Sequence, residues 1–211
     1  VRADQVKWGT VPFYVPFIPL GVWAHPQSIS TWGDSAVEVP WTLYMESGDP
    51  QVLADSYDLS RDWVNEVEQY LSPDGVWDRK PDFPLGQLGD WLDPTAPPED
   101  PTQAMTAKEL VATAFYARSC IQITRIAEIL GYADDAARYA ALRDHVIAGF
   151  LDRFIRLDGT MTSDTQCAYA LAIAFGLLDG EPVRKVKAGN CLACLVRESG
   201  GKPQIRQFPA T

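Results

Sequence analysis

The feature that most restricts the fold is an alternation between two kinds of helical segment. The first, third and fifth segments are apolar on more than one face, so each is expected to be buried on most sides. The segments that follow them are apolar along one stripe, which is typical of helices at the outside of a domain. The predicted helices cover residues 34–48, 50–71, 105–130, 134–155, 163–178 and 182–197.

This alternation predicts an all-α fold built from helical hairpins, with the apolar helices inside and the amphipathic helices outside. Six helices arranged in this way form three hairpins of an α/α toroid, and no segment has the pattern of a strand. The hydrophobic fraction of 46% is enough for such a core. In a toroid, every connection from an outer to an inner helix lies on the same rim. These connections are an irregular, proline-rich segment 1–31, a long loop 72–103, and the short stretch before Ser163.

Two of these rim connections carry an aromatic ring beside a carboxylate. Trp32-Gly33-Asp34 ends the first connection, and Gly89-Asp90-Trp91 lies in the long loop. Aromatic faces pack against the apolar CH faces of sugar rings, and carboxylates accept hydrogen bonds from vicinal hydroxyls. Two such clusters on one rim therefore indicate a carbohydrate pocket.

Each of these residues has a structural explanation that the sequence leaves open. Asp34 is also placed where it would cap the following helix. Trp32 and Trp91 are equally explained as anchors that pack their loops on the core. Ser163 and Gln166 match the S-x-x-Q capping box at a helix start. Only the co-location of these residues favours the functional interpretation.

Other classes of function find little support. The formal net charge of −10 argues against binding to nucleic acid or to an anionic membrane surface. No apolar run is long enough for a transmembrane helix, and no signal-peptide pattern opens the chain, which leaves the compartment open. Cys191 and Cys194 have a metal-like spacing, but a zinc site needs further ligands and the chain has only two histidines. We therefore expect neither a metal nor another cofactor.

Three motifs in order resemble those of bacterial α-L-rhamnosidases of glycoside hydrolase family 78. Residues 31–49 resemble the family's W-G-D-x-x-V-x-x-P-W-x-x-Y-x-x-x-G-D signature, and residues 89–94 resemble its G-D-W-L segment. Residues 163–178 are similar to its D-T-Q-x-A-Y-A-L-A helix, and residues 190–211 resemble the helix and rim loop that come next. The resemblance spans nearly the whole chain.

The resemblance implies a barrel of six inner and six outer helices, of which this chain supplies about three hairpins as part of one catalytic domain. It implies removal of terminal α-L-rhamnose from glycosides by an inverting mechanism, in which a general acid and a general base act on opposite faces of the sugar. A rhamnose-containing glycoside is therefore the expected partner. By motif, Trp32 and Trp91 would line the sugar pocket, Asp34 and Asp90 would lie at or beside it, and Gln166 would lie near the rim.

Two departures from the family pattern concern catalysis. The family's general acid is a Glu in an E-R-x-G-W-x-G-D motif, which does not occur before Trp32. Its general base lies in a later rim loop, and Glu38 and Glu46 match neither role. In addition, Gln207 and Ala210 replace glycines of the family's T-G-F-x-G-T loop. The chain therefore looks like the middle of a rhamnosidase catalytic domain without either catalytic Glu, and its catalytic residues stay unassigned.

Two other functions remain open on the sequence. One is a non-catalytic module that binds sugar or a partner through the Trp-rich rim. The other is a different α/α-toroid enzyme that pairs Asp34 with Asp90 or Asp93. In each case, an incomplete toroid would expose apolar faces of its end hairpins, so self-association through these faces is expected.

Overall fold

The computed structural model describes residues 1–21, 25–78, 87–91, 93–100, 103–178, 194–196 and 204–206. Its helices are α1 (Arg2–Trp8), α2 (Ser35–Ser47), α3 (Pro50–Glu68), α4 (Lys108–Leu130), α5 (Ala133–Phe154) and α6 (Gln166–Ala174). Two short strands, β1 (Cys194–Val196) and β2 (Gln204–Arg206), pair antiparallel with Leu195 opposite Ile205.

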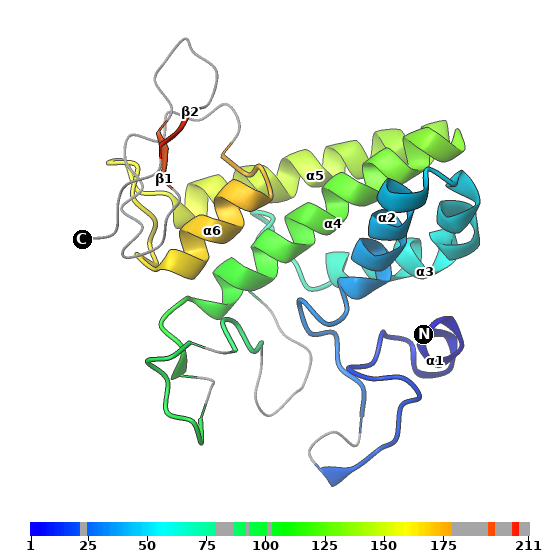
Figure 1. Ribbon diagram of the computed structural model, residues 1–211, viewed down its shortest axis with the longest axis horizontal. Helices are drawn as coiled ribbons and strands as arrows, with labels where there is room; N and C mark the ends of the chain where they lie inside the picture. The colour runs from blue at the N-terminus through cyan, green and yellow to red at the C-terminus, as the bar shows by residue number, and fades with distance from the viewer. Residues whose placement is uncertain are drawn as a thin grey trace.

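The burial that the alternation predicts holds for α3, α4 and α5, whereas most of α2 is exposed or half-buried. α4 packs against α2, α3, α5 and α6, and Figure 1 shows it running through the middle of the molecule. Its residues are buried on several faces, with Leu110, Tyr116 and Ile123 fully enclosed. α3 and α5 bury one stripe each and expose the rest. The all-α fold of helical hairpins is therefore confirmed, with α2, α4 and α6 as the inner helices.

The glycine signals at helix ends place two boundaries correctly. Gly48 ends α2 and Gly131 ends α4, with φ of 68° and 77° in the left-handed region that glycine enters without strain. The carboxylate of Asp49 accepts a hydrogen bond from Gln51 N at 2.9 Å and caps α3, whose first residue is Pro50. The hairpin turns therefore follow from local chemistry.

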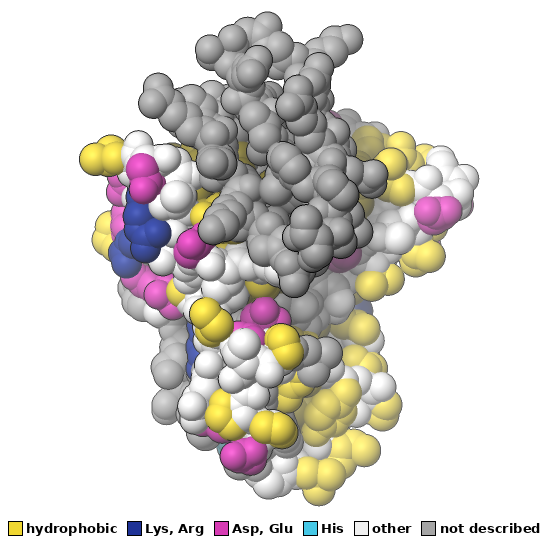
Figure 2. Space-filling view, turned by 60° about the vertical axis from the view of Figure 1, so that its left-hand side comes forward, with side chains coloured by type: hydrophobic (Ala, Val, Ile, Leu, Met, Phe, Trp, Pro, Cys, Tyr) yellow, Lys and Arg dark blue, Asp and Glu magenta, His cyan; other side chains and the backbone are white. Residues whose placement is uncertain are grey.

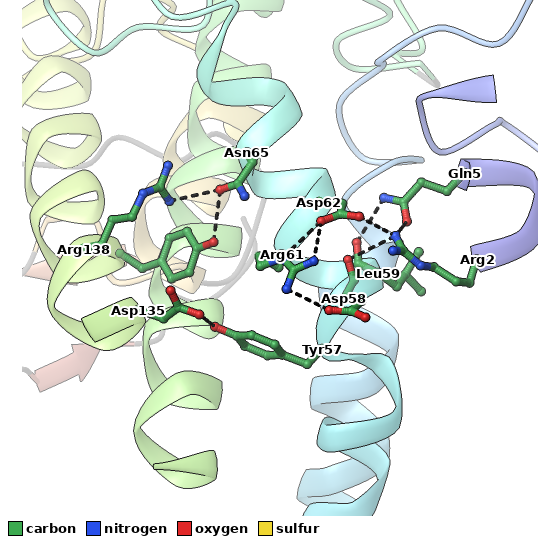
Figure 3. A network of polar contacts seen from close by, with 11 residues as sticks. Arg2, Gln5, Tyr57, Asp58, Leu59, Arg61, Asp62, Asn65, Asp135 and Arg138 are labelled. Atoms are coloured by element: carbon green, nitrogen blue, oxygen red, sulfur yellow. Dashed lines mark hydrogen bonds and ion pairs between the residues drawn. The ribbon is translucent and has the colours of Figure 1, made fainter. Parts of the chain in front are cut away.

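The expectation that residues 1–31 are irregular is wrong for its first part, because α1 forms there. Figure 3 shows the reason: α1 is tied to α3 by side chains. Arg2 pairs with Asp62 at 2.6 Å, and Gln5 Nε2 donates to Leu59 O at 3.1 Å. A helix this short is marginal alone, so these tertiary contacts stabilise it.

The end of the predicted helix 182–197 is also wrong, because Cys194–Val196 is a strand paired with Gln204–Arg206. The rest of that predicted helix lies outside the described residues, as do Cys191 and the side chain of Cys194. The helix predicted from Ser163 begins only at Gln166.

α2 keeps an exposed apolar face although it is an inner helix. Val39 and Leu43, one helical turn apart, are both exposed to solvent, and Met45 is exposed on another side of the helix. Self-association through such a face stays a prediction. In the part of the chain that the structure describes, no helix is long and apolar enough to cross a membrane.

Candidate functional site

The N-termini of α2, α4 and α6 are all directed toward the lower side of the molecule in Figure 1. Hydrogen bonds join the starts of α4 and α6 directly: the hydroxyls of Thr106 and Thr165 are 2.8 Å apart, and Ala107 N donates to Ser163 Oγ at 3.0 Å. These bonds bring together the connections that precede α4 and α6. Figure 2 shows hydrophobic side chains over the lower part of the molecule, where the loops before α2 and α4 lie.

An aromatic cluster forms where two of these rim connections meet. The rings of Trp32 and Trp91 are edge-to-face with centroids 6.1 Å apart, and Phe13 packs edge-to-face on Trp32 at 6.3 Å. Such geometry aligns ring edges with ring faces and stabilises the cluster. Both tryptophans are half-buried. The structure thus brings together two residues that lie far apart in the sequence and that the motifs predict at one site.

The cluster borders an open pocket of about 320 Å³, lined by Phe13, Tyr14, Trp32, Leu88 and Trp91. A second hollow of about 390 Å³ adjoins it and shares Phe13, Tyr14 and Trp32. A small apolar core of Ile29 and Leu88 lies behind the aromatic rings. The pocket therefore has an apolar wall whose rings pack on a buried core.

Phe13, Tyr14 and Leu88 line the pocket but were not predicted from the sequence. No motif marks Phe13 and Tyr14, which stand in a proline-rich stretch without regular period. The sequence shows only that aromatic residues are present in a predicted rim segment. It does not indicate which of them face the pocket.

Asp34 points into the protein rather than into the pocket. Its Oδ1 accepts hydrogen bonds from Ser119 Oγ at 2.7 Å and from Trp63 Nε1 at 3.1 Å, and its Oδ2 accepts from Thr31 N at 2.8 Å. The residue is 3% exposed. Its side chain makes no capping hydrogen bond to α2, so the N-cap explanation does not describe it. Asp34 instead ties the turn that carries Trp32 to α3 and α4.

Burial raises the pKa of Asp34, and the nearby Glu38 charge acts in the same direction, while the hydrogen bonds from Ser119, Thr31 and Trp63 oppose the shift. A raised pKa means that ionisation of Asp34 disfavours the folded state. Its contribution to stability is therefore greatest below its ordinary value of 3.8 and is lost as the pH rises through the pKa of the folded protein.

Asp34→Asn should remove this titration. The free energy of unfolding of the wild type, relative to the variant, should fall as the pH rises from below 4 to neutrality, because only the wild type ionises a carboxyl at position 34. Urea unfolding of both proteins across this pH range measures the difference. A difference that stays constant with pH would show that Asp34 does not titrate as its burial requires.

Asp90 lies beside the starts of α4 and α6. It is half-buried, and its charge adds to burial in raising the pKa of the Cys167 thiol to about 11. Asp93 has a different role: it accepts from Thr95 N at 2.8 Å and from Met105 N at 2.7 Å, which closes the rim loop. The pKa of Asp93 is lowered by its hydrogen bonds, and the one from the Thr95 side chain has the largest effect. The alternative enzyme that pairs Asp34 with Asp93 would depend on two carboxylates that already accept structural hydrogen bonds.

Gln166 is the first residue of α6 and is exposed. The capping box predicted from Ser163 does not form, because Thr165 caps α6 by accepting from Ala168 N at 3.3 Å. Ser163 accepts from Ala107 N instead. Gln166 therefore has no capping role, and its place near the pocket stays a prediction. In the described ranges, no group of three His, Cys, Asp or Glu side chains could hold a metal ion.

Comparison with known proteins agrees with this architecture. Residues 1–205 match the family model described as the bacterial alpha-L-rhamnosidase six-hairpin glycosidase domain. An alpha-L-rhamnosidase of Alteromonas sp. (strain LOR) is 34% identical over 186 residues, which are 84% of this chain and 19% of that protein. A second, from Formosa agariphila, is 32% identical over 190 residues, again 19% of its length. The chain thus spans 19% of the length of these relatives.

Solved structures show the same relationship. The alpha-L-rhamnosidase of Aspergillus terreus superposes with a TM-score of 0.72 at 33% identity, over 83% of this chain and 20% of that one. The Streptomyces avermitilis alpha-L-rhamnosidase, solved in complex with L-rhamnose, has a TM-score of 0.58 at 33% identity, over 71% of this chain and 13% of that one. By its motifs, its hairpins and these matches, the chain belongs to the bacterial α-L-rhamnosidase family and falls within the family's six-hairpin glycosidase domain.

Proposed function

We propose that this chain forms part of the sugar-binding wall of an inverting α-L-rhamnosidase domain that removes terminal α-L-rhamnose from glycosides. The observation that carries the proposal is the edge-to-face pair of Trp32 and Trp91 beside an apolar pocket on the rim. Rhamnose is a deoxy sugar with a methyl group, so it offers both an apolar CH face and hydroxyls. Binding of L-rhamnose by the Streptomyces avermitilis relative supports this assignment.

The residues at the pocket take different roles in this proposal. Trp32 and Trp91 pack against the apolar face of the sugar, while Phe13 and Leu88 hold their rings in place. Asp90, which is half-buried beside Trp91, accepts a hydrogen bond from a sugar hydroxyl. Gln166 contributes its amide from the exposed start of α6. Asp34 acts through the turn that it holds rather than by touching sugar.

We propose further that neither the general acid nor the general base lies in this chain. An inverting pair needs one carboxyl with a raised pKa and another about 6.5–9.5 Å away on the opposite face of the sugar. Glu38 does not suit the acid, because Arg118 binds both of its oxygens at 2.6 Å and holds the pKa of Glu38 below its usual range. Asp34 and Asp93 are occupied by the donors described above.

The test measures binding and hydrolysis on the same sample. The chain should bind L-rhamnose with a millimolar dissociation constant, seen as a change in tryptophan fluorescence, and should not hydrolyse an aryl α-L-rhamnoside. Asp90→Asn is the informative variant, since it keeps the size of the side chain and removes its charge. Turnover that Asp90→Asn abolishes would place a catalytic carboxyl in this chain. No binding by a folded sample would remove the sugar site.

A further inference from the structure

The two rim connections that carry the tryptophans are joined by one buried side chain, Gln87. Its Oε1 accepts a hydrogen bond from Ser30 N at 2.9 Å, and its Nε2 donates to Ser28 O at 3.4 Å. Gln87 is 6% exposed, and both serines are buried. A buried backbone N–H without a partner is costly, so the amide of Gln87 satisfies a group that the fold cannot leave unpaired.

The two hydrogen bonds of the Gln87 amide resemble those that a neighbouring β-strand would make. The amide binds the backbone on either side of Ile29, and the adjacent Leu88 packs against Ile29 in the small core behind the pocket. Trp32 follows Ser30 closely in the first connection, and Trp91 follows Leu88 in the second. The contact made by Gln87 therefore sets the distance between the two connections just before each reaches its tryptophan.

The first connection is also anchored to the helical layer at this point. Ser28 Oγ donates a hydrogen bond to Glu66 of α3, and the hydroxyls of Thr10 and Ser28 are 3.2 Å apart. Because Ser28 is held against α3, the second connection is the part that Gln87 positions. Gln87 itself does not line the pocket, which is bordered by Phe13, Tyr14, Trp32, Leu88 and Trp91.

We propose that Gln87 is a positioning residue of the sugar site: its amide holds the loop of Trp91 against the loop of Trp32 and so sets the edge-to-face geometry that receives the sugar. The proposal rests on the function proposed for the pocket. It adds that affinity for a rhamnoside depends on a buried amide that does not touch the ligand. A binding site whose supporting contacts are loosened loses affinity even when its contacting side chains are intact.

The test replaces Gln87 with leucine, which has a similar volume and can make neither hydrogen bond. Two readouts are taken: the dissociation constant for L-rhamnose by calorimetry, and the exciton band that an edge-to-face tryptophan pair contributes to the far-ultraviolet circular dichroism. The band of the rim pair is isolated by subtracting the spectrum of Trp91→Phe, because Trp63 and Trp77 form a second pair at 6.2 Å. Gln87→Leu should weaken affinity at least about tenfold and reduce the rim band.

The matched control is Gln103→Leu. Gln103 is an exposed glutamine of the same rim loop, and its Nε2 donates to Asp100 at 2.8 Å. This change removes a glutamine hydrogen bond but leaves the contacts of Gln87 with Ser28 and Ser30 intact. The affinity for L-rhamnose and the rim band should therefore stay as in the wild type. Equal loss in Gln87→Leu and Gln103→Leu would overturn the proposal.

A second variant keeps the test decisive if Gln87→Leu does not fold. In Gln87→Glu, the protonated carboxyl can donate to Ser28 O and accept from Ser30 N, whereas the ionised carboxylate can only accept. Burial favours the protonated form at low pH. The variant should bind L-rhamnose like the wild type near pH 5 and at least about tenfold more weakly near pH 8. The wild type at both pH values corrects for titration of other groups, among them Glu66, whose pKa burial raises.

The outcomes separate this proposal from the proposed function. Unchanged affinity and an unchanged rim band in both Gln87 variants would overturn the positioning role. A wild type that binds no rhamnose would overturn the function of the pocket, and the rim band would then still test whether Gln87 sets the geometry of the tryptophan pair. A reduced band in Gln87→Leu, restored in Gln87→Glu at low pH, supports the positioning role in either case.

Discussion

Replacing Gly33 with alanine should lower the free energy of unfolding by about 3 kcal/mol. A Cβ at this position would lie 2.0 Å from Cη2 and 2.4 Å from Cζ3 of Trp63. Trp63 is fully buried, its Nε1 donates to Asp34, and its ring packs against Trp77 at 6.2 Å, so it cannot move aside without breaking other contacts. Urea unfolding followed by circular dichroism measures the loss.

Gly48→Ala is the matched control for this prediction. Gly48 ends α2 with a φ of 68°, and nothing lies within 4 Å of a Cβ placed there. Alanine at Gly48 therefore meets only the penalty of the left-handed backbone, about 1 kcal/mol. Equal losses for the two variants would mean that the close approach of Trp63 does not constrain Gly33, and that the turn carrying Trp32 is looser than the structure indicates.

Trp32→Ala should weaken binding of L-rhamnose by about 30-fold, which corresponds to about 2 kcal/mol of binding free energy. The change removes the ring that borders the pocket and that packs edge-to-face with both Trp91 and Phe13. Trp32→Phe keeps an apolar face at the same place and should lose much less. Calorimetric titration of the two variants and the wild type measures the difference.

Trp41→Ala is the control for the loss of a tryptophan as such. Trp41 is half-buried on α2, packs near Tyr44 with ring centroids 5.8 Å apart, and does not border the pocket. Its removal should leave the affinity for rhamnose unchanged. Binding by Trp32→Ala at the strength of the wild type would contradict the account of the pocket.

The long helices could be predicted from the sequence because each is apolar either along one stripe or on several faces, and each has a clear end. The predicted ranges 105–130 and 134–155 agree with α4 and α5 to within a few residues. Glycines at Gly48 and Gly131 supply the left-handed residue that ends a helix, and this requirement is local. Apolar periodicity and local backbone chemistry were sufficient there.

The segments that could not be predicted depend on contacts made at long range. α1 has little intrinsic stability and forms because Arg2 and Gln5 reach α3. The apolar run from Ser163 predicted an earlier helix start than the structure has. Ser163 instead accepts a hydrogen bond from Ala107, the residue before α4, and Thr165 caps the helix. Sequence spacing does not reveal which donor a serine meets in three dimensions.

The candidate site also contains both features that could be predicted from the sequence and features that could not. The motifs predicted that Trp32 and Trp91 share a site, and the structure places their rings in contact. The direction of the Asp34 side chain could not be foreseen, since both a pocket carboxylate and a buried one fit the turn. Phe13 and Gln87 lie in irregular segments, where no period relates a residue to a face, and only the packing of two distant connections gives them a role.

The most direct test of the sugar site follows the seven tryptophan indole N–H signals by NMR during titration with L-rhamnose. Single Trp→Phe variants assign the signals. We expect saturable shifts at Trp32 and Trp91, with the signals of the buried Trp63 and Trp77 unchanged. Shifts confined to other tryptophans, or none at saturating sugar in a folded sample, would contradict a rhamnose site on this rim.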